Sequence, residues 1–137
     1  MTDPYRQGLD ILAQTGAVQD RRRNLVAEVA PEFARIAIGF TYGDIMGRPG
    51  LALNLRQLAA IAATAAIGTD IAELRAHVSA ALHLGWTKSE IIEILIQVAA
   101  HAGITASMQA LAGCHDLLVE MDPQCASCDA DSSGGQL

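Results

Sequence analysis

Apolar residues recur at helical spacing along most of the chain, and no segment shows sustained alternation of apolar and polar residues. A spacing of three and four residues places side chains on one face of an α-helix, whereas strict alternation is typical of a strand. The clearest stripe is rich in alanine: Leu55, Leu58, Ala59, Ala62, Ala65 and Ala66. Small side chains let backbones approach closely, so we expect this helix to be central. The pattern predicts an all-α protein.

Helix start and stop signals divide the chain into about six helices. Asn54 and either Thr69 or Asp70 are the expected N-caps of two of them, and Thr87 with Glu90 has the spacing of a capping box. The residues between 71 and 101 are expected to form a central antiparallel helical hairpin. The predicted helices cover residues 4–16, 31–46, 54–67, 71–84, 87–102 and 105–121.

The length of 137 residues is that of one domain. We assign residues 1–122 to it and expect residues 123–137, which are rich in Ser, Gly and Asp, to be a flexible tail. Cys125 and Cys128 in this tail have the spacing of a redox dithiol or of half a zinc site. A zinc site needs two more ligands and a redox dithiol usually begins a helix, so we expect no metal and no thiol chemistry here.

Charge and composition limit the partners. The formal net charge is −6, which argues against nucleic acid and anionic membranes, since both require a basic face. The apolar run from Ile91 to Cys114 is interrupted by Glu93 and His101, and the N-terminus lacks an apolar signal segment, so we expect a cytoplasmic protein without a membrane span. Because 51% of the residues are apolar, we also expect a homo-oligomer that buries part of this surface.

Glu73 and His77 are the first candidates for catalysis. They stand four residues apart within a predicted helix, so both side chains project from one face. A carboxylate and an imidazole together can hold and transfer a proton, although a solvated ion pair has the same spacing. The run from Arg21 to Arg23 has two interpretations as well, either an anion site or a solvated cluster paired with Asp20 and Glu28.

Several segments together resemble one family. In their order and spacing, over roughly residues 5 to 120, they resemble the carboxymuconolactone decarboxylase family. The resemblance implies an all-helical subunit with the alkylhydroperoxidase-like fold, assembled into a hexamer as a trimer of dimers, without metal or organic cofactor. The segments are Tyr42-Gly43-Asp44, Arg48-Pro49-Gly50-Leu51, the small-residue helix from Leu55, Glu73 to Leu82 with Gly85, Thr87 to Leu95, and His101-Ala102-Gly103.

The family has two branches. In the peroxidase branch a Cys-x-x-Cys pair precedes a helical histidine; when that histidine is set on His77, the cysteine positions fall on Asp70 and Glu73. The resemblance therefore favours the decarboxylase branch, which carries Glu and His at positions 73 and 77. It implies a cofactor-independent carboxy-lyase of aromatic catabolism, which removes CO₂ from a lactone like 4-carboxymuconolactone and leaves an enol-lactone.

Within this frame each candidate residue has an expected role. His77 would be the general acid, and Glu73 would fix its tautomer and favour its protonated form. Arg48 is a candidate for binding a substrate carboxylate, and Tyr42 and His101 are candidates for polar contacts with the substrate. Structural roles stay open for two of them, since Arg48 has the position of a helix C-cap and Tyr42 suits a core.

Two departures from the family pattern keep other functions open. His101 stands where decarboxylases tend to carry Tyr, and Ser79 stands where they tend to carry Arg, a partner for a substrate carboxylate. A diverged enzyme would catalyse decarboxylation, isomerisation or a C–C bond reaction on a biosynthetic substrate. A second alternative is a non-catalytic oligomeric binding protein. A third is a thiol antioxidant that uses the cysteines of the tail.

Overall fold

A computed structural model of the chain describes residues 2–16 and 20–120. Within these ranges every regular element is a helix, so the all-α class is confirmed. The predicted tail from residue 123, with Cys125 and Cys128, lies outside the described residues. The elements are α1 (Pro4–Gln14), α2 (Arg21–Val29), α3 (Pro31–Ile38), the π-helix η1 (Gly39–Met46), α4 (Leu53–Ile67), α5 (Ile71–His83), α6 (Lys88–Ala102), α7 (Ile104–Gly113) and α8 (His115–Leu118).

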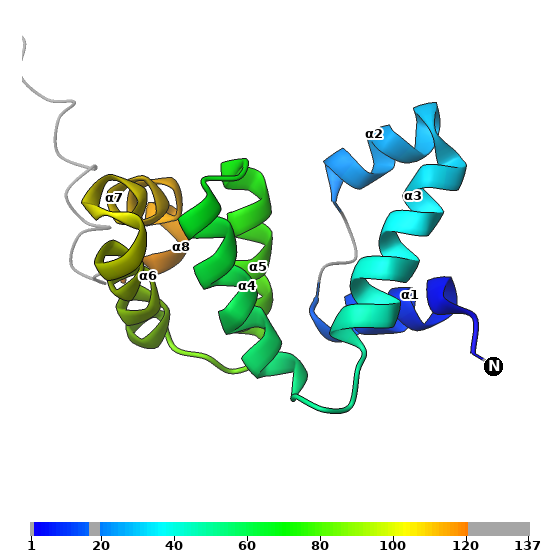
Figure 1. Ribbon diagram of the computed structural model, residues 1–137, viewed down its shortest axis with the longest axis horizontal. Coiled ribbons are helices and arrows are strands. Elements are labelled where there is room, and N and C mark those ends of the chain that lie inside the picture. The colour runs from blue at the N-terminus through cyan, green and yellow to red at the C-terminus, as the bar shows by residue number, and fades with distance from the viewer. Residues whose placement is uncertain (1, 17–19, 121–137) are drawn as a thin grey trace, which may run out of the picture.

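The helices form two groups that are joined by the segment 47–52 (Figure 1). In the first group α1 packs along η1 and α2 packs against α3. In the second group α4 contacts both α5 and α6, and α6 contacts α7. The groups are linked where α2 faces α5, because Arg22 bonds there to Glu73. This meeting place is where the candidate site lies.

The main core belongs to the second group. Ile61 from α4, Val78 from α5 and Leu95 from α6 are fully buried in one apolar cluster, together with Cys114. The predicted central position of the helix at 54–67 is confirmed, since α4 is in contact with α5, α6 and α7. Both α5 and α6 pack mainly on α4 rather than on each other. The antiparallel hairpin expected over residues 71–101 is therefore held together through α4.

Close backbone packing in the first group depends on glycine. A Cβ atom on Gly43 would overlap the carbonyl oxygen of Pro4, and a Cβ atom on Gly39 would lie 3.3 Å from the amide nitrogen of Tyr5. Helices whose facing residues lack side chains can pack with their backbones in contact, as α1 and η1 do here. This contact fixes the position of η1 and therefore of Tyr42, which η1 carries.

Two predicted boundaries were wrong. Asn54 does not cap α4, which begins at Leu53 with Ala52 as N-cap; the Asn54 side chain instead accepts a hydrogen bond from the N–H of Leu55. The helix predicted over residues 105–121 is interrupted after Gly113 and continues as the short α8. A Cβ atom on Gly113 would overlap the side chain of Ile71, because the first residue of α5 packs directly against the backbone of Gly113.

Other signals were read correctly, and one helix was missed. Asp70 is the N-cap of α5, and the capping box of Thr87 and Glu90 opens α6, as predicted. Helix α2 was not predicted, because none of its residues is buried and it therefore lacks an apolar stripe. Its detectable signal is Asp20, whose carboxylate accepts hydrogen bonds from the backbone N–H groups of Arg22 and Arg23.

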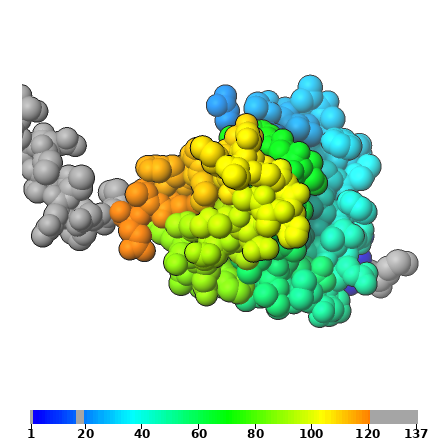
Figure 2. Space-filling model, turned by 60° about the vertical axis from the view of Figure 1, so that its left-hand side comes forward, coloured from blue at the N-terminus to red at the C-terminus, as the bar shows by residue number. Residues whose placement is uncertain are grey.

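Much apolar surface stays uncovered in the subunit. Phe33, Ile36 and Phe40 follow one another at helical spacing on α3 and η1, and each is more than half exposed. Helices α6 and α7, which come forward in Figure 2, carry three further exposed apolar side chains: Ile96, Ile104 and Met108. None of the helices in the described ranges is long and apolar enough to cross a membrane.

The packing of α1 on η1 can be tested with Gly43→Ala. We expect a loss of about 1–3 kcal/mol in the free energy of unfolding, because the added methyl group forces α1 and η1 apart. Gly50→Ala is the matched control, since a Cβ atom there meets nothing within 4 Å. Urea unfolding followed by circular dichroism measures both; equal stability of the two variants would contradict the close contact.

Candidate active site

His77 lies in the middle of α5 with only 7% of its surface exposed. Its Nδ1 is 2.9 Å from Oε1 of Gln57, and its Nε2 is 3.3 Å from Oε1 of Glu73. Both neighbouring oxygens accept hydrogen bonds, so both bonds form when each ring nitrogen carries a hydrogen. The ring is thus held in one orientation by α4 and α5, in an arrangement suited to the protonated imidazole.

Gln57 was missed by the sequence analysis. It is 1% exposed and its side chain bonds to His77 across the interface of α4 and α5. The buried face of α4 runs through Gln57, Ile61 and Ala65, so the helix is rotated relative to the expected stripe, and Leu55 is 43% exposed. The sequence did contain a signal for Gln57, which is a polar side chain in the apolar helix predicted to be central. A polar group that is buried requires a hydrogen-bond partner.

Glu73 divides its two oxygens between His77 and Arg22. Oε1 faces His77, and Oε2 accepts a hydrogen bond from Nη2 of Arg22. The hydrogen bond with His77, and after it the bond with Arg22, lower the pKa of Glu73 from 4.5 to about 2, against the opposing effect of burial. Glu73 is therefore ionised throughout the neutral range.

Tyr42 reaches the same place from η1. Burial raises the pKa of its phenol, so the hydroxyl keeps its proton and can donate a hydrogen bond. The guanidinium of Arg23 lies 5.9 Å from the centre of its ring, within the range of a cation–π contact. Of the three residues expected to bind substrate, Tyr42 is the one that the structure brings together with Glu73 and His77.

A cavity of about 440 Å³ opens at this place, between α2, η1, α4 and α5. Gln57, His77 and Tyr42 line it, and beside it lies a more apolar cavity of about 230 Å³ that is lined by Glu73, Tyr42 and Phe33. In the wall of the larger cavity basic side chains outnumber the acidic Asp20. The basic side chains are Arg21, Arg22, Arg23, Arg75 and His83. The wall is cationic in a chain of net charge −6 and suits an anionic small molecule.

Arg48 and His101 lie away from this cavity in the subunit. Arg48 is exposed after the end of η1, and its carbonyl oxygen accepts a hydrogen bond from Arg56. His101 is exposed at the end of α6 and lines a separate apolar cavity with Leu58 and Val98. Within the subunit the structure therefore brings neither Arg48 nor His101 to the cavity of His77, and their role in substrate binding stays a prediction.

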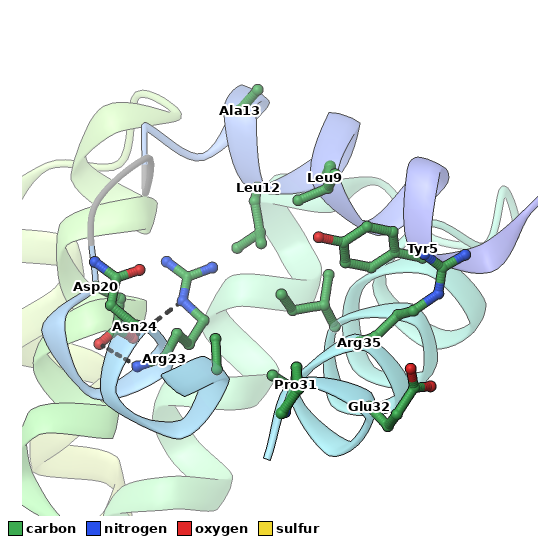
Figure 3. A pocket seen from close by; sticks show the side chains of 13 residues that line it. Tyr5, Leu9, Leu12, Ala13, Asp20, Arg23, Asn24, Pro31, Glu32 and Arg35 are labelled. Carbon is green, nitrogen blue, oxygen red and sulfur yellow. Dashed lines mark hydrogen bonds and ion pairs between the residues drawn. The ribbon is translucent and has the colours of Figure 1, made fainter. Parts of the chain in front are cut away.

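A cavity of about 540 Å³, larger than the one at His77, lies between α1, α2 and α3 (Figure 3). Leu9 and Leu12 project into it from α1. Arg35 in its wall pairs with Asp3 and lies over the ring of Tyr5, and Arg23 pairs with Asp20. It contains no histidine, so we place the candidate site at His77 despite the smaller volume there. In the described part of the chain no three His, Cys, Asp or Glu side chains cluster closely enough to hold a metal ion.

Comparison with known proteins agrees with this architecture. The model of the carboxymuconolactone decarboxylase family matches residues 31–114, so the chain belongs to that family. Among individual relatives, the chain is 31% identical over 109 residues to the 4-carboxymuconolactone decarboxylase of Acinetobacter baylyi, covering 78% of this chain and 81% of the relative. The family match includes Tyr42, Gln57, Glu73 and His77, and it begins after α2.

The ion pairs of Glu73 predict a pH dependence of stability. Because folding lowers its pKa from 4.5 to about 2, the stabilisation is complete above pH 4.5 and is lost as the pH falls toward 2. We therefore expect the difference in unfolding free energy between wild type and Glu73→Gln to shrink from pH 6 to pH 3, measured by urea unfolding. Glu93→Gln, on the exposed side of α6, is the matched control. A difference that is constant with pH would contradict the pairing.

Proposed function

We propose that the chain is a decarboxylase that removes CO₂ from a small carboxylated unsaturated lactone without a cofactor. One observation carries the proposal: a buried imidazole, held between an amide and a carboxylate, in the wall of a cationic cavity. Membership of the carboxymuconolactone decarboxylase family supports it, as does the similarity to a 4-carboxymuconolactone decarboxylase.

In this proposal the substrate itself accepts the electrons. When the bond between the ring carbon and the carboxylate breaks, CO₂ leaves and the electron pair moves through the conjugated double bond to the lactone carbonyl. The resulting enolate takes one proton at carbon and becomes the enol-lactone. One proton is consumed for each CO₂ released, so the enzyme has to orient the lactone, stabilise the enolate and donate a proton.

Each side chain of the site has a role in this reaction. Protonated His77 would deliver the proton, and ionised Glu73 would hold the ring while balancing its charge. The phenol of Tyr42, which stays protonated, would donate a hydrogen bond to the carbonyl oxygen as negative charge develops there.

A second candidate keeps the chemistry and changes the substrate. Ser79 follows His77 by two residues and lines the cavity. Decarboxylases of the family tend to carry Arg at this position. A serine there leaves more room and one fewer cation, which favours a bulkier or less charged acid. Parallel assays with 4-carboxymuconolactone and with other unsaturated carboxylated lactones distinguish the two candidates.

We also propose a homo-oligomer, and a hexamer is the arrangement that the family resemblance implies. The support is the apolar row of Phe33, Ile36 and Phe40 on α3 and η1. An exposed apolar patch of this kind is costly in a subunit that stays alone in water.

The proposed general acid can be tested with His77→Gln. We expect the rate of CO₂ release from 4-carboxymuconolactone, followed by ultraviolet absorbance, to fall by about 10²–10⁴-fold, which is the usual contribution of a positioned acid. The rate of the Glu73→Gln variant is expected to fall as well. The control is His115→Gln, which changes an exposed histidine in α8. Full activity of folded His77→Gln would refute the assignment.

The proposed assembly can be tested with Ile36→Glu. A carboxylate in the exposed apolar row is expected to dissociate the oligomer, because burying an unpaired charge in an interface is unfavourable. Sedimentation velocity measures the change, and Glu32→Ala on the same helix is the control that should keep the wild-type mass. A wild-type chain that sediments as a monomer would contradict the proposal.

A further inference from the structure

Arg22 joins the two groups of helices at the candidate site. It extends from the first turn of α2 to α5, where Nη2 bonds to Glu73 and Nη1 lies 3.7 Å from Oδ2 of Asp70. Its side chain is 44% exposed, and it lines both the cationic cavity and the apolar cavity beside it. Arg22 is therefore accessible to any molecule that enters either cavity.

The bond between Arg22 and Glu73 is a bond between a guanidinium and a carboxylate. A substrate carboxylate that enters the cavity presents the same group with the same geometry, so it can replace Glu73 as the partner of Arg22. Glu73 would not be left without a partner by this exchange, because its other oxygen already faces His77. After the exchange, the imidazole of His77 would be the remaining partner of the Glu73 carboxylate.

The other cations of the wall are less suited to this role. Arg75 is bound through both of its terminal nitrogens to Asp116 and also donates to the carbonyl of Gly113. Arg23 pairs with Asp20 and lies over the ring of Tyr42. Arg21 lines only the larger cavity. Arg22 is the one of these four that lines both cavities while bonded to Glu73.

We propose that Arg22 binds the substrate carboxylate that is not released as CO₂, and that this retained carboxylate replaces Glu73 as the partner of Arg22. This inference rests on the proposed decarboxylase function and adds a residue that determines specificity. The retained carboxylate is the suitable partner because its charge is the same before, during and after the reaction. A cation placed on the departing carboxylate would stabilise the ground state and lose its partner as CO₂ forms, which would slow the reaction.

The proposal predicts a separation of kinetic effects. An interaction that is equal in the ground state and the transition state changes KM and leaves kcat nearly unaltered. For Arg22→Gln we expect KM for 4-carboxymuconolactone to rise about 10- to 100-fold, as for the loss of a charged hydrogen bond, with kcat within about threefold of wild type. Arg22→Lys should be intermediate. Arg6→Gln, which changes an exposed arginine of α1 that lines neither cavity, is the control with a nearly unchanged KM.

A substrate analogue identifies the carboxylate. In the monomethyl ester of the retained carboxylate the negative charge is absent, so wild type should bind the ester as weakly as Arg22→Gln binds the natural diacid. Arg22→Gln itself should hardly distinguish ester from acid. An unchanged KM of Arg22→Gln, or an equal loss with acid and ester, would overturn the inference while leaving the decarboxylase function intact.

Failure of the function is recognised separately. If wild type shows no turnover of either lactone, the proposed function is wrong, and the inference is then decided by equilibrium binding of muconate, an unsaturated dicarboxylate, measured by calorimetry. Weaker binding to Arg22→Gln than to wild type and Arg6→Gln supports a carboxylate site at Arg22. Equal affinity of all three proteins, or binding to none, overturns it. Circular dichroism spectra show that the variants compared are folded.

Discussion

The buried ring of His77 is the constraint on which the rest of the site depends. An imidazole in an apolar core is destabilising unless its two nitrogens find partners, and here Gln57 and Glu73 supply them from α4 and α5. Glu73 is in turn bound by Arg22, which belongs to the other group of helices. One chain of polar contacts therefore positions the ring and also links the two halves of the subunit.

Electrostatics at the site differ from those of the whole chain. The protein carries a net charge of −6, yet the wall of the cavity is dominated by arginine. The acids nearest to it already have partners, since Glu73 bonds to Arg22 and His77, and Asp20 caps α2 while pairing with Arg23. Local pairing leaves a cationic hollow on an acidic protein, which favours a small anion as its ligand.

The sequence was sufficient for the helical class, for the caps at Asp70 and Thr87, and for the proximity of Glu73 and His77, because each follows from local periodicity or spacing. Gln57 could not be found in this way, since the rotation of α4 about its axis depends on how its neighbours pack. Helix α2, which carries Arg22, buries no residue and so has no apolar period to detect. Arg48 and His101 belong to segments that resemble the family, but similarity of a segment does not show which face of the subunit it occupies.

The two halves of the subunit contribute different parts of the chemistry. Gln57, Glu73 and His77 stand on the helices that enclose the apolar core, where close packing restricts both position and substitution. Arg22 stands on a helix without buried residues, which can accept substitutions at little cost in folding. If the proton donor and the carboxylate partner are divided in this way, substrate preference can change through α2 while the proton chemistry of α5 stays intact. A cavity placed between a rigid core helix and a surface helix would then allow one fold to act on related acids.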